Sequence, residues 1–173
     1  MKNLLQRTIA YLIDSTLCFL LIMVVIQWGI LSHIREGIGL SDDWFKNPWN
    51  AELYVILTIS LPVWLYFMYF DSYKTKGSLG KRIFKLRVTD TEYHPISMGK
   101  SFWRTVCKLA PWELAHIGVL FPSPMYFEND PNLRIVTIVG LVLFVAFMGS
   151  IWKSPKNQSF YDLWLGTMVQ TKP

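Results

Sequence analysis

Charged residues and cysteines are scarce in this chain of 173 residues. Lys, Arg, Asp and Glu make up 17% of it, against about 25% in an average soluble domain. The two cysteines, Cys18 and Cys107, both stand in apolar stretches, which excludes a disulfide framework and a cysteine metal site. Hydrophobic residues reach 52% and aromatic residues 16%. This composition excludes a disordered chain and a nucleic-acid-binding arm, and it indicates a lipid bilayer as the surroundings.

Long apolar runs account for the high hydrophobic content. The runs at residues 8–31, 51–70 and 133–152 each reach about the 20 residues that a membrane-spanning helix needs. Pro62 lies in the middle of the second run and predicts a kink, a feature that membrane helices tolerate. The sequence therefore predicts at least three membrane-spanning helices.

Residues 102–121 form a fourth run of similar length, but this run is polar. Hydropathy alone would not select it as a span, so an interfacial or re-entrant helix is the alternative to a full crossing. Its four ionisable residues are Arg104, Lys108, Glu113 and His116.

Basic residues are distributed unevenly between the two sides of such a bundle. With four spans and both chain ends on one side, only Arg35, Lys46 and Arg134 of the 17 Lys and Arg residues lie on the opposite side. Cytoplasmic loops of membrane proteins carry an excess of Lys and Arg. The sequence therefore predicts an all-α, multi-pass cell-membrane protein with four spans and both termini in the cytoplasm. If the third segment lay flat instead, Lys153, Lys156 and Lys172 would lie outside.

The longest polar segment, residues 71–100, lies between the second and third runs. Leu86 and Val88 alternate with charged residues there, as in a strand, and turn residues follow at 89–95. We expect a small cytoplasmic β-hairpin, to which the tail at 166–170 can add a strand. The basic residues of this segment are expected to contact anionic lipid headgroups. They are Lys74, Lys76, Lys81, Arg82, Lys85 and Arg87.

Ionisable residues inside a membrane helix are costly, and they mark candidate functional positions. Asp14 lies two helical turns beyond Arg7 in the first run. Lys108 lies at a similar depth in the polar run, and Arg104 lies near the level of Arg7. Either Lys108 or Arg104 is therefore the expected partner of Asp14.

Glu113 and His116 lie deeper in the polar run, three residues apart, so they share one helix face. Two interpretations of the intramembrane charges stay open. They form an inert network that fixes how the helices pack, or Asp14, Glu113 and His116 line a path for a proton or a cation.

Four stretches, in this order along the chain, combine arginine, aspartate and glycine. They read RTIAYLID at 7–14, TKGSLGK and KLRVTD at 75–81 and 85–90, SFWR at 101–104, and NQSFYD followed by GT at 157–162 and 166–167. Together they resemble the RDD family of integral membrane proteins, which is named for one arginine and two aspartates. Tyr161 stands where the family often has a histidine.

The resemblance implies a single domain over residues 1–173, with Arg7, Asp14 and Asp162 as the residues that give the family its name. It also implies transport of small ligands, sodium–proton antiport among them, and a place in the bacterial inner membrane. Asp162 lies in the tail, residues 153–173, on the same side as Arg7 and Arg104. It is expected to contact one of these arginines in a structural rather than a catalytic role.

Two functions are compatible with these observations. In the first, the protein is a small transporter in which Asp14 exchanges a proton for a cation such as sodium or for another small solute, and a parallel homodimer supplies the second half of the path. In the second, it is a scaffold that binds membrane lipids or a protein partner and transports nothing. The sequence carries no catalytic triad, metal-site spacing or cofactor motif, so we expect neither an enzyme nor a bound cofactor.

Overall fold

The computed structural model describes residues 2–156 and 158–171. Its first long helix consists of three consecutive segments, α1 (Lys2–Phe19), the π-helical η1 (Leu20–Leu31) and α2 (Ser32–Gly37). Trp28 and Ile30 in η1 are exposed, as are most of the apolar side chains around them. An apolar helix with most of its surface exposed suits contact with lipid rather than with water.

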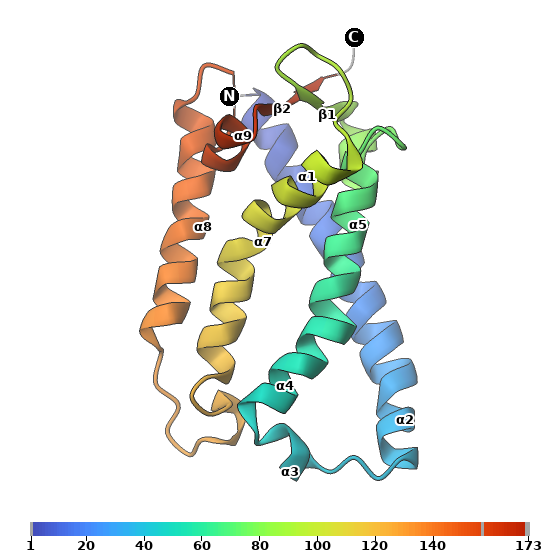
Figure 1. Cartoon of the computed structure of the whole chain (residues 1–173), viewed down its shortest axis with the longest axis vertical. Coiled ribbons are helices and arrows are strands. Elements are labelled where there is room, and N and C mark those ends of the chain that lie inside the picture. The colour runs from blue at the N-terminus through green and yellow to red at the C-terminus, as the bar shows by residue number, and fades with distance from the viewer. Residues whose placement is uncertain (1, 157, 172–173) are drawn as a thin grey trace.

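The second long helix follows a short α3 (Asp42–Phe45) and contains α4 (Pro48–Val55), the π-helical η2 (Ile56–Ser60) and α5 (Leu61–Asp71). Pro62 lies in the first turn of α5, directly after η2. Proline removes one helical hydrogen bond, and a π-helical turn is a common way to accommodate such a defect. Figure 1 shows the helix changing direction between α4 and α5, where Pro62 predicts a kink.

The third and fourth long helices, α7 (Met98–Leu120) and α8 (Ile135–Lys153), are joined by a loop with one 3-10 turn, η3 (Met125–Phe127), and pack closely. Two glycines allow this approach. A Cβ atom on Gly118 would lie 2.6 Å from the backbone nitrogen of Thr137, and one on Gly140 would lie 2.7 Å from the carbonyl oxygen of Pro111. Small residues at helix contacts are typical of membrane proteins, in which close packing drives association.

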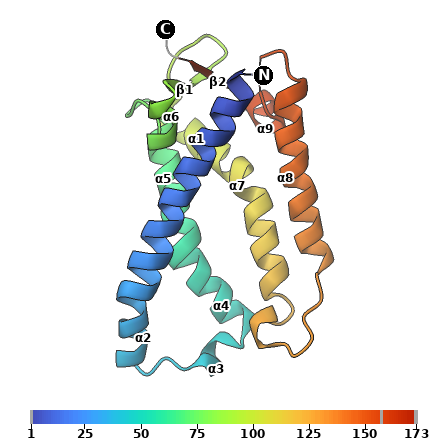
Figure 2. The same cartoon turned by 180° about the vertical axis from the view of Figure 1, so that it is seen from behind.

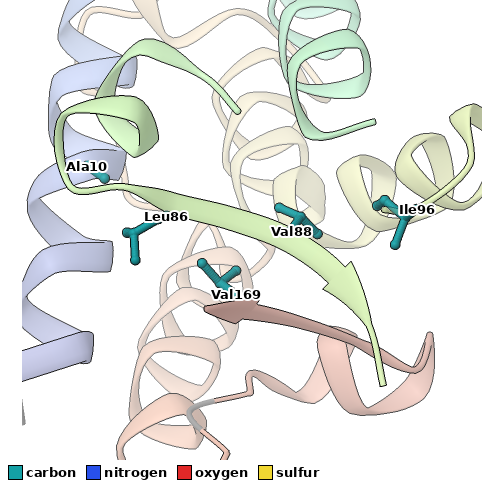
Figure 3. Packing of buried hydrophobic residues seen from close by; sticks show 5 residues of the cluster. All are labelled: Ala10, Leu86, Val88, Ile96 and Val169. Atoms are coloured by element: carbon teal, nitrogen blue, oxygen red, sulfur yellow. The ribbon is translucent and has the colours of Figure 1, made fainter. Parts of the chain in front are cut away.

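A small sheet and two short helices, α6 (Leu79–Ile83) and α9 (Phe160–Trp164), gather at one end of the molecule, here called the sheet end (Figure 1). Strand β1 (Leu86–Asp90) runs antiparallel to β2 (Thr167–Thr171), with Val88 opposite Val169. Figure 3 shows the apolar cluster that holds the sheet. It consists of Ala10 from α1, Leu86 and Val88 from β1, Ile96, and Val169 from β2.

Within residues 2–156 and 158–171, three helices are long and apolar enough to cross a membrane, namely Leu4–Gly37, Pro48–Asp71 and Ile135–Lys153. Helix α7 has 23 residues but carries the charged side chains noted above. Figures 1 and 2 show that the starts of α1 and α7 lie at the sheet end together with the ends of α5 and α8. The expectation of a mostly helical membrane protein with a small sheet is confirmed.

The expected hairpin is wrong in its pairing. The partner of β1 is the tail strand β2, and the segment after β1 adds only a single bridge between Thr89 and Pro95. The expected turn is present, and the Asp90 side chain accepts hydrogen bonds there from the backbone N–H groups of Glu92 and His94. The chain after it forms no second strand, because Ser97 already caps the start of α7. The residues just before β1, at 79–83, form the short helix α6.

Candidate functional site

Asp162 lies between two arginines at the sheet end. Its Oδ2 accepts a hydrogen bond from Nη2 of Arg7 at 2.9 Å, and its Oδ1 accepts one from Nε of Arg104 at 2.9 Å. The hydroxyl of Thr167 also donates to Oδ1, at 2.9 Å. The side chain of Asp162 is fully buried, and that of Arg104 is 2% exposed. Asp162 thus contacts the starts of both α1 and α7. The sequence predicted a contact with only one of the two arginines.

Asp71, at the end of α5, continues the ion pairs. Nη1 of Arg104 donates to its Oδ2 at 2.8 Å, and the ammonium of Lys81 binds its Oδ1. Each of these two carboxylates therefore contacts two cations, which offsets part of the cost of burying charge. The alternating series, here called the ionic chain, joins α1, α9, α7, α5 and α6, and it runs Arg7–Asp162–Arg104–Asp71–Lys81.

Hydrogen bonds with Ser159 also hold Asp162 in place, independently of the two arginines. The Ser159 side chain accepts from the N–H of Asp162, and the Asp162 carboxylate accepts from the N–H of Ser159, each at 3.3 Å. This reciprocal capping box begins α9. Burial by itself would raise the pKa of Asp162, but Arg104 and Arg7 outweigh it and hold the pKa below its ordinary value. The carboxylate is therefore ionised at neutral pH.

Asp14 is 1% exposed and is held by three donors from elsewhere in the chain. The hydroxyl of Tyr66 and the N–H of Gly80 each donate to its Oδ1 at 2.9 Å, and the hydroxyl of Ser78 donates to its Oδ2. Gly80 lies in the first turn of α6, where backbone N–H groups have no partner within the helix. Asp14 therefore fixes the start of α6 against α1.

The expected ion pair of Asp14 with Lys108 or Arg104 is wrong. Arg104 binds Asp71 and Asp162, and the ion pairs among residues 2–156 and 158–171 include none for Asp14. The predicted partners of Asp14 were chosen only among charged residues at a similar depth in the helices. The hydroxyl and backbone donors that satisfy Asp14 are neutral, and they come from α5 and the start of α6.

Lys108 lies close to Asp14 but contacts aromatic rings. Its Nζ is 3.1 Å from the ring centroid of Phe67 and 5.2 Å from that of Tyr11. A cavity of about 70 Å³ lies beside it. The polar and charged side chains that line this cavity, here called the charged cavity, are Arg7, Thr8, Tyr11, Asp14, Lys81, Arg104, Lys108 and Tyr161.

Glu113 and His116 do not join the ionic chain. Glu113 accepts hydrogen bonds from the Ser60 hydroxyl and from Nε1 of Trp64, both at 2.9 Å, and so ties α7 to the second long helix. His116 packs against Trp112, and its Nδ1 is buried without a hydrogen-bond partner in the part of the chain that the structure describes. These two residues are separate from the charged cavity.

The six basic residues expected at lipid headgroups differ in their exposure. Lys81 is buried and its ammonium binds Asp71, so the prediction that it contacts lipid headgroups is wrong. Arg87 is half-buried. The other four are exposed at the sheet end, namely Lys74, Lys76, Arg82 and Lys85.

Sequence reasoning missed Asp71, Tyr66 and Ser78. Asp71 directly follows the apolar run 51–70, and a carboxylate at the end of a span is a signal that could have placed it near Arg104. Tyr66 and Ser78 gave no such signal, because hydroxyl groups are common in both helices and loops. Among residues 2–156 and 158–171, no three His, Cys, Asp or Glu side chains gather closely enough to hold a metal ion.

Comparison with known proteins supports the family and nothing finer. No curated protein and no solved structure matches the chain. The RDD family model matches residues 2–166, which include Arg7, Asp14 and Asp162. The chain, with its apolar helices and small sheet, belongs to the RDD family of integral membrane proteins.

Proposed function

We propose that the protein is a small multi-pass transporter in which Asp14 couples proton movement to the passage of a cation or another small solute. The observation that supports this proposal is the position of Asp14 in the wall of the charged cavity, next to Lys108. A carboxylate and an ammonium that do not bind each other can both respond to a solute entering between them. Intramembrane ionisable residues commonly serve such paths.

The proposed topology has four spans, with α7 as the third. In support, α7 has 23 residues and packs closely against α8 at Gly118 and Gly140. The sheet end would face the cytoplasm of a bacterial inner membrane, since Lys74, Lys76, Arg82 and Lys85 are exposed there. A parallel homodimer, which the same charge bias favours, stays a prediction.

The second candidate function is a scaffold that transports nothing. The specific observation in its favour is the ionic chain, which ties five elements together at the sheet end in a largely buried cluster. Such a cluster stabilises one arrangement of the helix ends, whereas a transporter must open at this end during its cycle.

The Asp14→Asn variant separates these two functions. We expect wild-type protein in liposomes with a trapped pH dye to show a pH change when sodium, potassium or lithium is added outside. Asparagine keeps the size of the side chain but cannot carry a proton, so the variant should lose the signal. Asp130→Asn is the matched control, since it makes the same change at an exposed loop residue.

Persisting pH-dependent exchange in correctly inserted Asp14→Asn protein would contradict the role assigned to Asp14. A complete lack of signal from folded wild-type protein with each of the three cations would favour the scaffold.

A further inference from the structure

Helix α9 carries its polar side inward and its apolar side outward, the reverse of an ordinary surface helix in a soluble protein. Asp162 is fully buried, whereas Phe160, Leu163 and Trp164 are 56%, 54% and 76% exposed. Three of the five side chains of α9 thus present apolar surface that none of the described residues covers. Apolar surface gathered in this way marks contact with lipid or with another molecule.

Polar contacts fix this orientation of α9. Asp162 binds Arg7 and Arg104, and its capping box with Ser159 holds the first turn of the helix. Turning α9 to bury its apolar side would break both ion pairs of Asp162 in a buried region, which is costly. The apolar side of α9 therefore has to face outward.

The start of α9 lies level with the end of a membrane-spanning helix. The backbone N–H of Phe160 donates to the hydroxyl of Ser150 at 3.1 Å. Ser150 lies in the last turn of α8, which ends at Lys153, so the contact is within about 5 Å of that end along the axis. Figures 1 and 2 show α9 beside the last turns of α8. Because α8 is long and apolar enough to cross the membrane, α9 lies near the boundary between acyl chains and headgroups.

The end of α8 carries residues that are typical of this boundary. Trp152 is exposed, and so are Lys153 and Lys156 after it. Tryptophan rings gather at the level of the headgroups, and lysine side chains can extend their ammonium groups into them. The apolar side of α9 thus continues the lipid-contacting surface of α8, which favours lipid as its partner.

We propose that α9 is an interfacial anchor, whose side chains Phe160, Leu163 and Trp164 are immersed in the membrane leaflet at the sheet end. The lipid partner is the upper part of the acyl chains, just below the headgroups, where short amphipathic helices bind. Lipid contact on one side of α9 then holds Asp162, on the other side, against Arg7 and Arg104. This inference does not rest on transport or on which side of the membrane the sheet end faces.

A nitroxide label at position 163 tests the immersion. The label is attached to Leu163→Cys in protein carrying Cys18→Ala and Cys107→Ala, in liposomes of phosphatidylcholine and phosphatidylglycerol. Its spin relaxation is measured with oxygen, which concentrates in lipid, and with a polar nickel chelate, which stays in water. Glu92→Cys, in the exposed turn after β1, gives the value for water, and Ile138→Cys, exposed on α8, gives the value for acyl chains. We expect position 163 to be reached by oxygen more than by nickel, with a ratio between those of the two reference positions.

Two results would overturn the proposal. Equal access of the nickel chelate to positions 163 and 92 would place α9 in water. Protection of position 163 from both reagents would show that a second copy of the chain, rather than lipid, covers α9.

Hydrogen exchange tests whether lipid contact holds the tail in place. The double variant Leu163→Gln with Trp164→Gln keeps the polar contacts of α9 and removes much of its apolar surface. In the same liposomes, the backbone N–H groups of β2 should exchange about tenfold faster than in the wild type, since less apolar surface is immersed. Tyr126→Gln is the matched control, because it makes the same kind of change at an exposed aromatic residue of a distant loop and should leave the exchange of β2 unchanged. Equal exchange in all three proteins would show that lipid does not hold the tail, whatever the result of Asp14→Asn in the transport experiment.

Discussion

Replacing Asp162 by asparagine is expected to lower the free energy of unfolding by about 3–5 kcal/mol, the range found when one partner of a buried ion pair is removed. Asparagine keeps the shape of the side chain and can still cap α9. It cannot compensate the charges of Arg7 and Arg104, whose side chains are 8% and 2% exposed. Neither guanidinium can reach water without separating α9 from the starts of α1 and α7. The loss can be measured by circular dichroism during titration of detergent-solubilised protein with sodium dodecyl sulfate.

The matched control is Asp43→Asn. Asp43 also forms an ion pair, with Lys46 at 2.6 Å, but both side chains are exposed. We expect no measurable change in that variant, because exposed pairs contribute little. Equal stability of Asp162→Asn and Asp43→Asn would show that the ionic chain does not hold the sheet end together.

The ion pairs of Asp162 also predict a pH dependence. Its pKa is lowered in the folded state, with Arg104 and Arg7 outweighing the effect of burial. The stabilisation should therefore be fully present above about pH 4, the ordinary value for aspartate. It should be lost as the pH falls through the lowered folded-state value. Asp162→Asn should lack this component, which a comparison of unfolding curves between pH 2 and 6 would detect.

The sequence predicted the part of the ionic chain from Arg7 to Arg104 better than the part from Asp71 to Lys81. Arg7, Arg104 and Asp162 were found because all three lie on the basic side of the chain at similar depths. Asp71 and Lys81 were not paired, since the distribution of charge indicates which side a residue is on but not whether it is buried. Lys81 was accordingly assigned to lipid headgroups, although it binds Asp71.

The helices were predicted closely because apolar runs of span length leave few alternatives. The runs at 51–70 and 133–152 correspond to helices at Pro48–Asp71 and Ile135–Lys153. The polar segment offered no such constraint. Alternation of Leu86 and Val88 located β1, but its partner strand lies about 80 residues further along the chain. Strand pairing over that distance depends on how α1 and α9 pack. The local sequence pattern carries no information about that packing.

The contact between α6 and α1 gives the other large expected effect. Replacing Gly80 by alanine is expected to destabilise the protein by about 3 kcal/mol or more, through overpacking and through loss of a hydrogen bond to a charged group. The added Cβ would lie 2.8 Å from the carbonyl carbon and 3.0 Å from the Cα of Ala10. Because these are backbone atoms of α1, α6 would have to move away. That movement would break the hydrogen bond from the N–H of Gly80 to Asp14.

Two further variants make this prediction specific to the contact. Gly99→Ala adds a methyl group to a helical glycine of α7 that has nothing within 4 Å, so its stability should stay the same or rise slightly. Ala10→Gly should not rescue Gly80→Ala, since it removes the side chain of Ala10 and leaves the clashing backbone atoms in place. Rescue by Ala10→Gly, or equal unfolding curves for Gly80→Ala and Gly99→Ala, would show that the backbones of α6 and α1 are not in contact. Asp14 would then lose one of its three donors, and the charged cavity one of its walls.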